Sequence, residues 1–104
     1  MVTNLEVKKI INTPFGVASE DGGRLYEEIF QRLKNGESVK VSFAGITRLT
    51  TAFLNAGIGQ VYNEFSEEYV RKHLRVSNLD EKGLNLLRRV VDRAKIFFAD
   101  RRKA

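Results

Sequence analysis

The sequence predicts an α/β fold in which a small mixed or parallel sheet is covered by helices, in the order β-α-β-α-α-β-α. Two periodicities in the sequence carry this prediction. In short segments apolar and polar residues alternate, which is the pattern of strands, and in the longer segments between them apolar residues recur at helical spacing. Strands that alternate with helices in this way pair in parallel through right-handed crossovers. With 104 residues, 42% of them hydrophobic, the chain is expected to form one domain over residues 1–104.

The first half of the predicted fold is a strand, a helix and a second strand. Residues 5–11 are predicted as a strand from an imperfect alternation, which the segment around Pro14 then breaks. A helix should begin at Ser19, whose hydroxyl can cap free backbone amides, and end near Asn35, which tolerates a left-handed backbone. The alternation over residues 39–43 predicts the second strand.

A helix with internal glycines should follow. Thr50 or Thr51 is expected to cap it, and its apolar residues continue at helical spacing as far as Phe65. Gly57 and Gly59 lie inside it, and a glycine in a helix interior costs about 1 kcal/mol. The pair therefore indicates either close packing against a neighbouring element or a bend.

The remaining elements are a short helix, a short strand and a long final helix. The short helix is predicted over residues 66–73 and the strand over residues 74–79. Asn78 and Glu81 resemble a capping box at the start of the final helix, which should cover residues 80–98.

The final helix carries two neighbouring apolar stripes. One stripe suffices to cover a sheet, so the second either completes a wide core face or forms a partner surface, and we expect a homodimer through it. The first stripe contains Leu84, Leu87, Val91, Ala94 and Phe98, and the second contains Leu86, Val90 and Phe97.

Composition argues against several classes of function. There is no cysteine and only one histidine, His73, which excludes disulfides, thiolate sites and histidine-cluster zinc sites. No catalytic partner lies near His73 in sequence, and no phosphate-binding glycine motif is present. We therefore expect no enzyme, no metal and no cofactor. With no signal peptide and no apolar run of about 20 residues, the chain should be cytoplasmic and make no membrane contact.

Basic residues gather at the C-terminal end. Residues 88–103 contain seven basic and two acidic residues, a surplus equal to the net charge of +5 of the whole chain. Such a region attracts nucleic acid, anionic membranes or acidic proteins, although it is more often the solvated face of a terminal helix. A basic nucleic-acid-binding accessory protein that uses the C-terminal helix is thus the alternative function. No recognition signature for nucleic acid is visible, so nucleic acid is not the expected partner.

Four segments of the sequence carry a resemblance to a known family. They are SEDGGRL at residues 19–25, GESVKVSFAGI at residues 36–46, TTAFLN at residues 50–55 and VSNL at residues 76–79. Their order and spacing are similar to the STAS fold of anti-sigma-factor antagonists, and more closely to the bacterial STAS-like domain family, whose function is not established. The resemblance extends from about residue 19 to residue 98.

The resemblance implies a non-enzymatic regulatory protein-binding module. In STAS antagonists the second helix begins with Asp-Ser, and a kinase of the ATPase type phosphorylates the serine. The matching residues here are Thr50 and Thr51, so the resemblance implies Thr51 as the phosphorylation site, whereas Thr50 departs from the family pattern because it lacks the carboxylate. It also implies a histidine-kinase-type ATPase as the partner in a partner-switching pathway.

The start of the second helix is the expected partner-binding site. It follows the carboxyl end of a strand, where α/β sheets place binding surfaces. Phe53 and Leu54 are adjacent and point about 100° apart on a helix, so one of them is expected to face a partner. The complete expected site is Thr50, Thr51, Phe53, Leu54 and Asn55.

Overall fold

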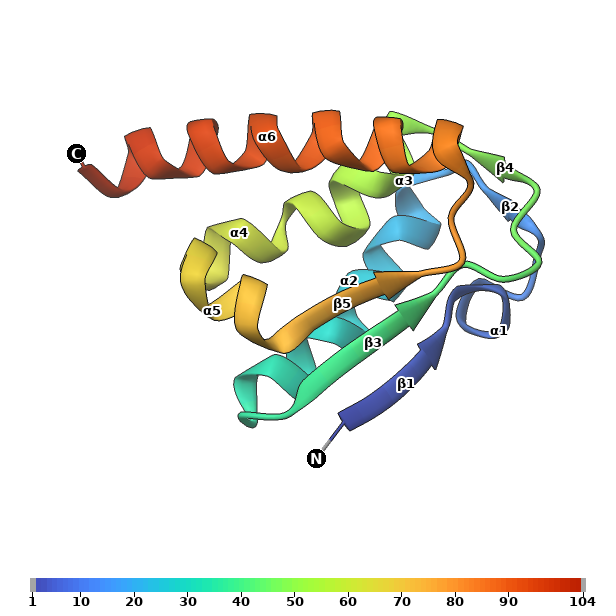
Figure 1. Ribbon diagram of the computed structural model, residues 1–104, viewed down its shortest axis with the longest axis horizontal. Coiled ribbons are helices and arrows are strands. Elements are labelled where there is room, and N and C mark those ends of the chain that lie inside the picture. Colours follow the sequence, from blue (N-terminus) through green and yellow to red (C-terminus); the bar gives the residue numbers. More distant parts are fainter. Residues whose placement is uncertain (1, 104) are drawn as a thin grey trace.

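The structure is a computed structural model that describes residues 2–103, with the side chains of residues 2–99. Within this range a three-stranded parallel sheet has the order β1-β3-β5 (Figure 1). Leu5, Val41 and Val76 lie side by side across it. The predicted α/β class with a small parallel sheet and helices is confirmed. The strands are β1 (Val2–Glu6), β3 (Ser38–Ser42) and β5 (Leu74–Ser77).

Helices connect the three strands, and a further helix forms the C-terminal end of the fold. α2 (Ser19–Lys34) lies between β1 and β3 in the chain. Three consecutive helical segments follow β3, and we refer to them together as the central helix (residues 51–64). They are α3 (Thr51–Leu54), the π-helical turn η1 (Asn55–Gly59) and α4 (Val61–Glu64). α5 (Glu67–His73) then leads into β5, and α6 (Glu81–Lys103) runs across the central helix (Figure 1).

The N-terminal strand is shorter than predicted. A strand over residues 5–11 was expected, but β1 ends at Glu6 and is followed by the helical turn α1 (Val7–Ile11). Val7 and Ile11 are four residues apart, so a single helical turn places both side chains on the buried side. The asparagine that follows adopts a left-handed conformation, with φ 58°, and ends the turn.

A second parallel sheet was not predicted. β2 (Phe15–Gly16) pairs with β4 (Arg48–Leu49), where the sequence indicated only turns. Two residues are too few for a strand alternation to be visible in a sequence. The Thr50 N–H donates to the Gly16 carbonyl oxygen at 3.0 Å, so this small sheet leads directly into the central helix.

The predicted cap of α2 is wrong. Ser19 is the first residue of the helix, and the N-cap position is Ala18, which offers no side-chain acceptor. The acidic residues that follow, Glu20 and Asp21, lie in the first turn, where they complement the positive end of the helix dipole.

The predicted capping box of α6 is also wrong, and β5 ends earlier than expected. β5 stops at Ser77 because Asn78 leaves the extended conformation, with φ 62°. The Asn78 amide donates instead to the Ser42 hydroxyl oxygen at 2.7 Å, which links the ends of β5 and β3. Asp80 acts as the cap, since its Oδ1 accepts from the Gly83 N–H at 2.7 Å.

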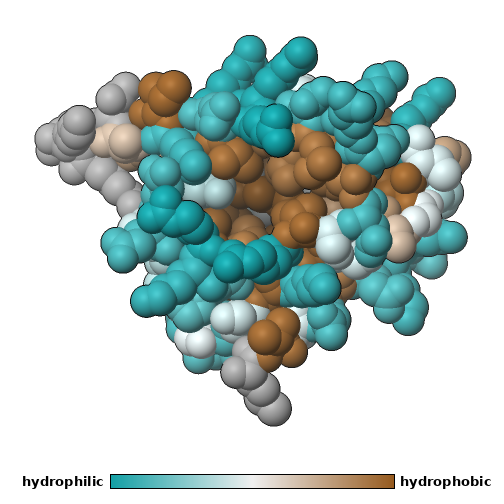
Figure 2. Space-filling model, viewed as in Figure 1, coloured by the Kyte–Doolittle hydropathy of each residue, from teal (hydrophilic) through white to brown (hydrophobic). Residues whose placement is uncertain are grey.

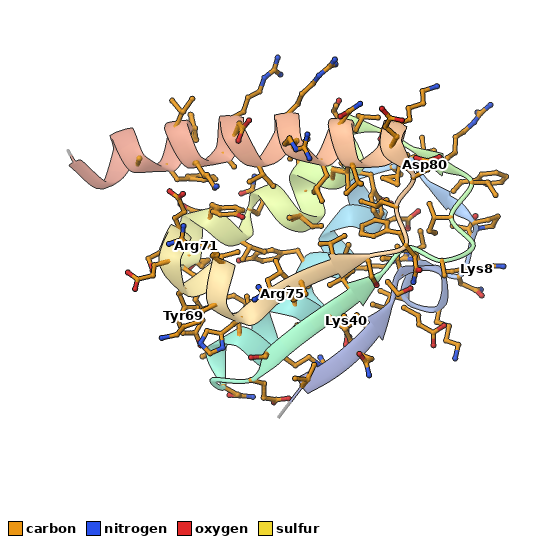
Figure 3. All side chains as sticks on the ribbon, in the orientation of Figure 1. Lys8, Lys40, Tyr69, Arg71, Arg75 and Asp80 are labelled. Atoms are coloured by element: carbon orange, nitrogen blue, oxygen red, sulfur yellow. The ribbon has the colours of Figure 1, made fainter. Side chains whose placement is uncertain are left out.

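The main sheet has one packed face and one open face. Leu5, Val39 and Val41 point into the core and are buried. Lys40 and Arg75, which are neighbours in the register, lie on the other face and are exposed (Figure 3). The helices therefore cover the sheet mainly from one side.

Glycine lets α2 and the central helix approach each other closely. A Cβ atom added to Gly22 would lie 2.5 Å from the Phe53 carbonyl oxygen and 2.9 Å from the Ala56 Cβ. A Cβ atom on Gly57 would lie 3.2 Å from the Gly22 carbonyl oxygen. Close packing and a deviation from α-helix thus coincide at Gly57, which lies in the π-helical turn.

α6 packs against the core with one wide apolar face that contains residues of both predicted stripes. Val90, Ala94 and Phe98 are buried, and Leu86, Leu87 and Val91 are partly buried against the core, whereas Leu84 and Phe97 are more than 40% exposed. Of the two alternatives, the second stripe therefore completes a wide core face, except at Phe97. The homodimer stays a prediction, but Val90 is not available to form it. Figure 2 shows apolar surface between α6 and β5, bordered by hydrophilic side chains.

The contact between Gly22 and the central helix gives a stability prediction. We expect Gly22→Ala to lower the free energy of unfolding by about 1–3 kcal/mol, because the added methyl group meets a backbone carbonyl that cannot move freely. Gly23→Ala is the matched control. It meets no atom within 4 Å, and alanine favours a helix interior by up to about 1 kcal/mol. Urea denaturation of both variants checks this, and equal stabilities would contradict the close approach.

Candidate functional site

Thr50 is the N-cap of the central helix, and its hydroxyl is fully engaged. Its Oγ1 accepts from the Phe53 N–H at 3.1 Å and donates to the Val17 carbonyl oxygen at 2.6 Å. The residue is extended, with φ −123° and ψ 158°, as an N-cap requires. Of the two threonines that the sequence offered as caps, Thr50 is therefore the one that fixes the helix start.

Thr51 is the threonine with a free hydroxyl. It is the first residue of α3 and is exposed, and within the described part of the chain its side chain makes no hydrogen bond. Asn55, one turn further along, is also exposed. Of the five residues in the predicted site, Thr51 and Asn55 are the two that are exposed, and they lie one turn apart on the central helix.

Phe53 and Leu54 do not face outward, so the expectation that one of them contacts a partner is wrong. Both are fully buried. The Phe53 ring lies against Gly16, where an added Cβ would be 3.3 Å from two ring carbons. α3 packs against α2 and against α6, so two directions 100° apart on the helix both lead into the protein.

Thr51 and Asn55 line a groove between the central helix and α6. A cavity of about 320 Å³ is lined by Thr51, Ala52, Asn55, Arg89, Val90 and Arg93. A second cavity of about 270 Å³ is lined by Asn55, Gln60, Arg93, Ala94, Phe97 and Phe98. The two cavities share Asn55 and Arg93, so they adjoin, and we refer to them together as the α3–α6 groove.

The α3–α6 groove is basic. Arg89 and Arg93 are one helical turn apart on α6 and both are exposed. Within the described residues neither arginine forms an ion pair, whereas the nearby Lys95 pairs with Glu67 at 3.3 Å. Among the side chains that the structure describes, none that lines the groove is acidic. Guanidinium groups in such a setting bind carboxylate or phosphate groups through paired hydrogen bonds.

The π-helical turn shapes the wall of the groove opposite α6. It begins at Asn55, and a Cβ on Gly59 would lie 2.7 Å from the Asn55 Oδ1 and 3.4 Å from the Val90 Cγ1. The absence of a side chain at Gly59 therefore leaves room for the Asn55 side chain, and Val90 of α6 packs beside the same position. Single π-helical turns are frequent at functional sites, which agrees with the position of this one beside the groove.

Sequence reasoning missed four residues at or near this site. Arg89 and Arg93 were noted as part of a basic helix, but nothing in the sequence indicated that they face Thr51. Phe15 and Val17, at 52% and 38% exposed, lie on or next to β2, whose end is hydrogen-bonded to Thr50. No signal in the sequence indicates that Phe15 and Val17 are exposed here, because a two-residue strand leaves no alternation to detect.

A larger cavity lies at the carboxyl ends of β3 and β5. It has a volume of about 350 Å³, and α/β sheets commonly bind ligands at this edge. Its walls include Phe43 and Leu86, and its charged residues are Arg48, Lys82 and the acidic Asp80. It contains none of the site residues that the sequence predicted and is separate from the α3–α6 groove.

His73 is used in packing. Its Nδ1 lies 3.1 Å from the Ser38 Oγ, and its ring packs on Tyr69 with 4.3 Å between centroids. The Tyr69 hydroxyl in turn donates to the Leu33 carbonyl oxygen at 2.6 Å. These contacts hold α5 against β3 and α2.

Two tyrosines have side-chain pKa values above the ordinary value of tyrosine. Burial raises the pKa of Tyr26, and the carboxylates of Glu64 and Glu27 raise it further. Burial likewise raises the pKa of Tyr62, with Glu67 and Asp92 as the neighbouring charges. Both phenols therefore stay protonated at neutral pH.

The described residues form neither a metal-binding cluster nor a membrane-spanning helix. No three histidine, cysteine, aspartate or glutamate side chains in this part of the chain lie close enough together to hold a metal ion. No helix in the same part is long and apolar enough to cross a membrane.

The two threonines at the helix start should differ in their effect on stability. We expect Thr50→Ala to lower the free energy of unfolding by about 1 kcal/mol, because the cap bond to Phe53 is lost. Thr51→Ala removes a hydroxyl without a partner and should change it by less than about 0.5 kcal/mol. Chemical denaturation of both variants measures the difference. A larger loss for Thr51→Ala would contradict the assignment of Thr50 as the cap.

Comparison with known proteins identifies the family. The sequence profile of a family described as a STAS-like domain of unknown function matches residues 21–84, which is more than half of the chain. The matched range contains most of α2, β3, the central helix, α5 and β5, and hence Thr51 and Asn55. A search of curated proteins and a search of solved structures each find no match. The chain therefore belongs to the family of STAS-like domains of unknown function.

Proposed function

We propose that this protein is a cytoplasmic, non-enzymatic regulatory module that binds a protein partner through the α3–α6 groove. The observation that carries the proposal is the charge of the groove. Arg89 and Arg93 stand unpaired within the described structure, opposite the free hydroxyl of Thr51, and no acidic residue lines the space between them. Such a site suits a partner that presents a carboxylate-bearing segment.

Apolar surface adjoins the basic groove. Phe15 and Val17 are exposed beside the start of the central helix, and Phe97 is 58% exposed at the far end of the groove. Aromatic residues and arginine are the residue types enriched in protein–protein interfaces, where they supply most of the binding energy. The arrangement therefore supports a protein partner, and the resemblance to STAS antagonists makes a histidine-kinase-type ATPase the first candidate.

Phosphorylation of Thr51 would regulate this binding. The γ-phosphoryl group of ATP passes to the Thr51 Oγ1, the hydroxyl proton is released and ADP leaves. The product carries a charge of about −1.5 to −2 at neutral pH, placed in the groove that the partner's carboxylates would occupy. Complete release of a bound partner requires about 5.5 kcal/mol of differential affinity, which a phosphate supplies only if the contact it displaces is central to the interface.

Charge reversal in the groove tests the proposal. The double variant Arg89→Glu, Arg93→Glu should weaken binding of the partner at least tenfold, because two attractive charges become repulsive. Arg88→Glu is the matched control, since Arg88 is exposed on the same helix but does not line the groove. The partner is captured from a source-cell lysate with the wild-type protein, purified, and titrated calorimetrically. Equal loss of affinity in the double variant and the control would contradict the proposed site.

The basic helix also defines the alternative function, nucleic-acid binding. Arg88, Arg89 and Arg93 are all exposed on α6, which favours some attraction to phosphate backbones. We expect this binding to be weak, independent of sequence, and to fall steeply between about 50 and 200 mM salt. Fluorescence anisotropy with labelled duplexes of different sequence measures it. Sequence-selective binding below micromolar concentration at the higher salt would favour the alternative.

A further inference from the structure

We propose that Arg89 and Arg93 bind the phosphate of phosphorylated Thr51 within the same molecule, so that the modification fastens α6 to the start of α3 and fills the α3–α6 groove. This inference rests on the phosphorylation of Thr51 in the proposed function. It adds the receptor for the phosphate and the way in which the modification acts.

Position is the first argument. Thr51, Arg89 and Arg93 line the same cavity of about 320 Å³, Thr51 on one wall and the arginines on the other. The two arginines are four residues apart, so their side chains leave α6 in the same direction. A phosphate on the Thr51 Oγ1 extends from one wall toward the other, into the space that two long side chains can reach.

Chemical complementarity is the second argument. A phosphothreonine presents three strong acceptor oxygens, and a guanidinium group donates two parallel hydrogen bonds to such an anion. Neither arginine is held by a carboxylate within the described residues, so neither has an ion pair to give up. The hydroxyl at residue 50 cannot take this part, because it already bonds to Phe53 and Val17.

The rigid spacing of the two walls is the third argument. Val90, which lies between the arginines in sequence, is 5% exposed, and its Cγ1 would lie 3.4 Å from a Cβ atom added to Gly59 of the π-helical turn, against which α6 packs. α6 is thus already packed on the π-helical turn before any modification. The pairing requires the arginine side chains to rotate, and the helices do not have to move.

Phosphorylation would then control partner binding by occupying the two arginines of the groove. The phosphate takes up both cations that a partner's carboxylates would otherwise bind, and it does so without a change of fold. A Thr51→Glu variant should imitate this poorly, because a single carboxylate carries one charge and two acceptor oxygens and cannot satisfy both arginines. Phosphorylated protein should therefore release the partner more completely than the glutamate variant does.

The pairing can be tested without any partner. Phosphothreonine is introduced genetically at residue 51 of the full chain, and its second pKa is measured by ³¹P NMR against that of a short peptide with the same phosphothreonine. We expect the folded protein to show a pKa lowered from about 6 by roughly 0.5–1, because the two guanidinium groups favour the dianion. The double variant Arg89→Gln, Arg93→Gln should return the value to that of the peptide, and the control Arg88→Gln should leave it lowered.

The outcomes separate this inference from the proposed function. A pKa equal to that of the peptide, or one that the double variant does not change, overturns the intramolecular pairing even if phosphorylation still releases the partner. A lowered pKa that depends on both arginines supports the pairing, even if the partner then proves to bind elsewhere. Thermal unfolding at low and high salt adds a second readout. Phosphorylation should raise the midpoint at low salt in the wild type and not in the double variant.

Discussion

The close approach of α2 to the central helix is the contact on which the rest of the structure depends. Gly22 and Gly57 bring two backbones together where any larger residue would push them apart. On its other side the same π-helical turn packs against α6, where the Val90 side chain is buried beside Gly59. The central helix is thus packed between α2 and α6, and the π-helical turn takes part in both contacts. This packing places α6 beside the helix start and forms the α3–α6 groove.

The chemistry of the site follows from that arrangement. Because α3 is packed on both sides, its two large apolar residues are buried in the core, and only the small residues Thr51 and Ala52 reach solvent. Because α6 presents Val90 to the core, the arginines that flank it in sequence point to the edge of the contact. The helix start at Thr51 and the basic face of α6 therefore meet with no acidic side chain of the described residues between them. Phe15 and Val17, which are exposed at β2, add apolar area to this surface, and protein interfaces commonly contain such area at their centre.

Much of the fold could be predicted from the sequence, and the failures have physical causes. The alternation at β3 and the long periodicities of α2 and α6 are strong local signals, and the structure agrees with them. At residues 5–11 the spacing of Val7 and Ile11 fits a helical turn as well as an irregular strand. The helical turn α1 has only five residues, which is too short for its periodicity to distinguish the two structures. β2 and β4 are too short to leave any pattern. For the site, Thr51 and Asn55 could be found from the resemblance, whereas their proximity to Arg89 and Arg93 is a tertiary contact that no spacing encodes.

Binding of a partner across the α3–α6 groove can be tested with an NMR map of the complex. The uniformly ¹⁵N-labelled protein is titrated with its purified, unlabelled partner, and amide and guanidinium signals are followed. We expect the largest changes at Thr51, Asn55, Arg89 and Arg93, on both walls of the groove. Changes confined to the open face of the sheet around Lys40 and Arg75, with the groove signals unmoved, would contradict it.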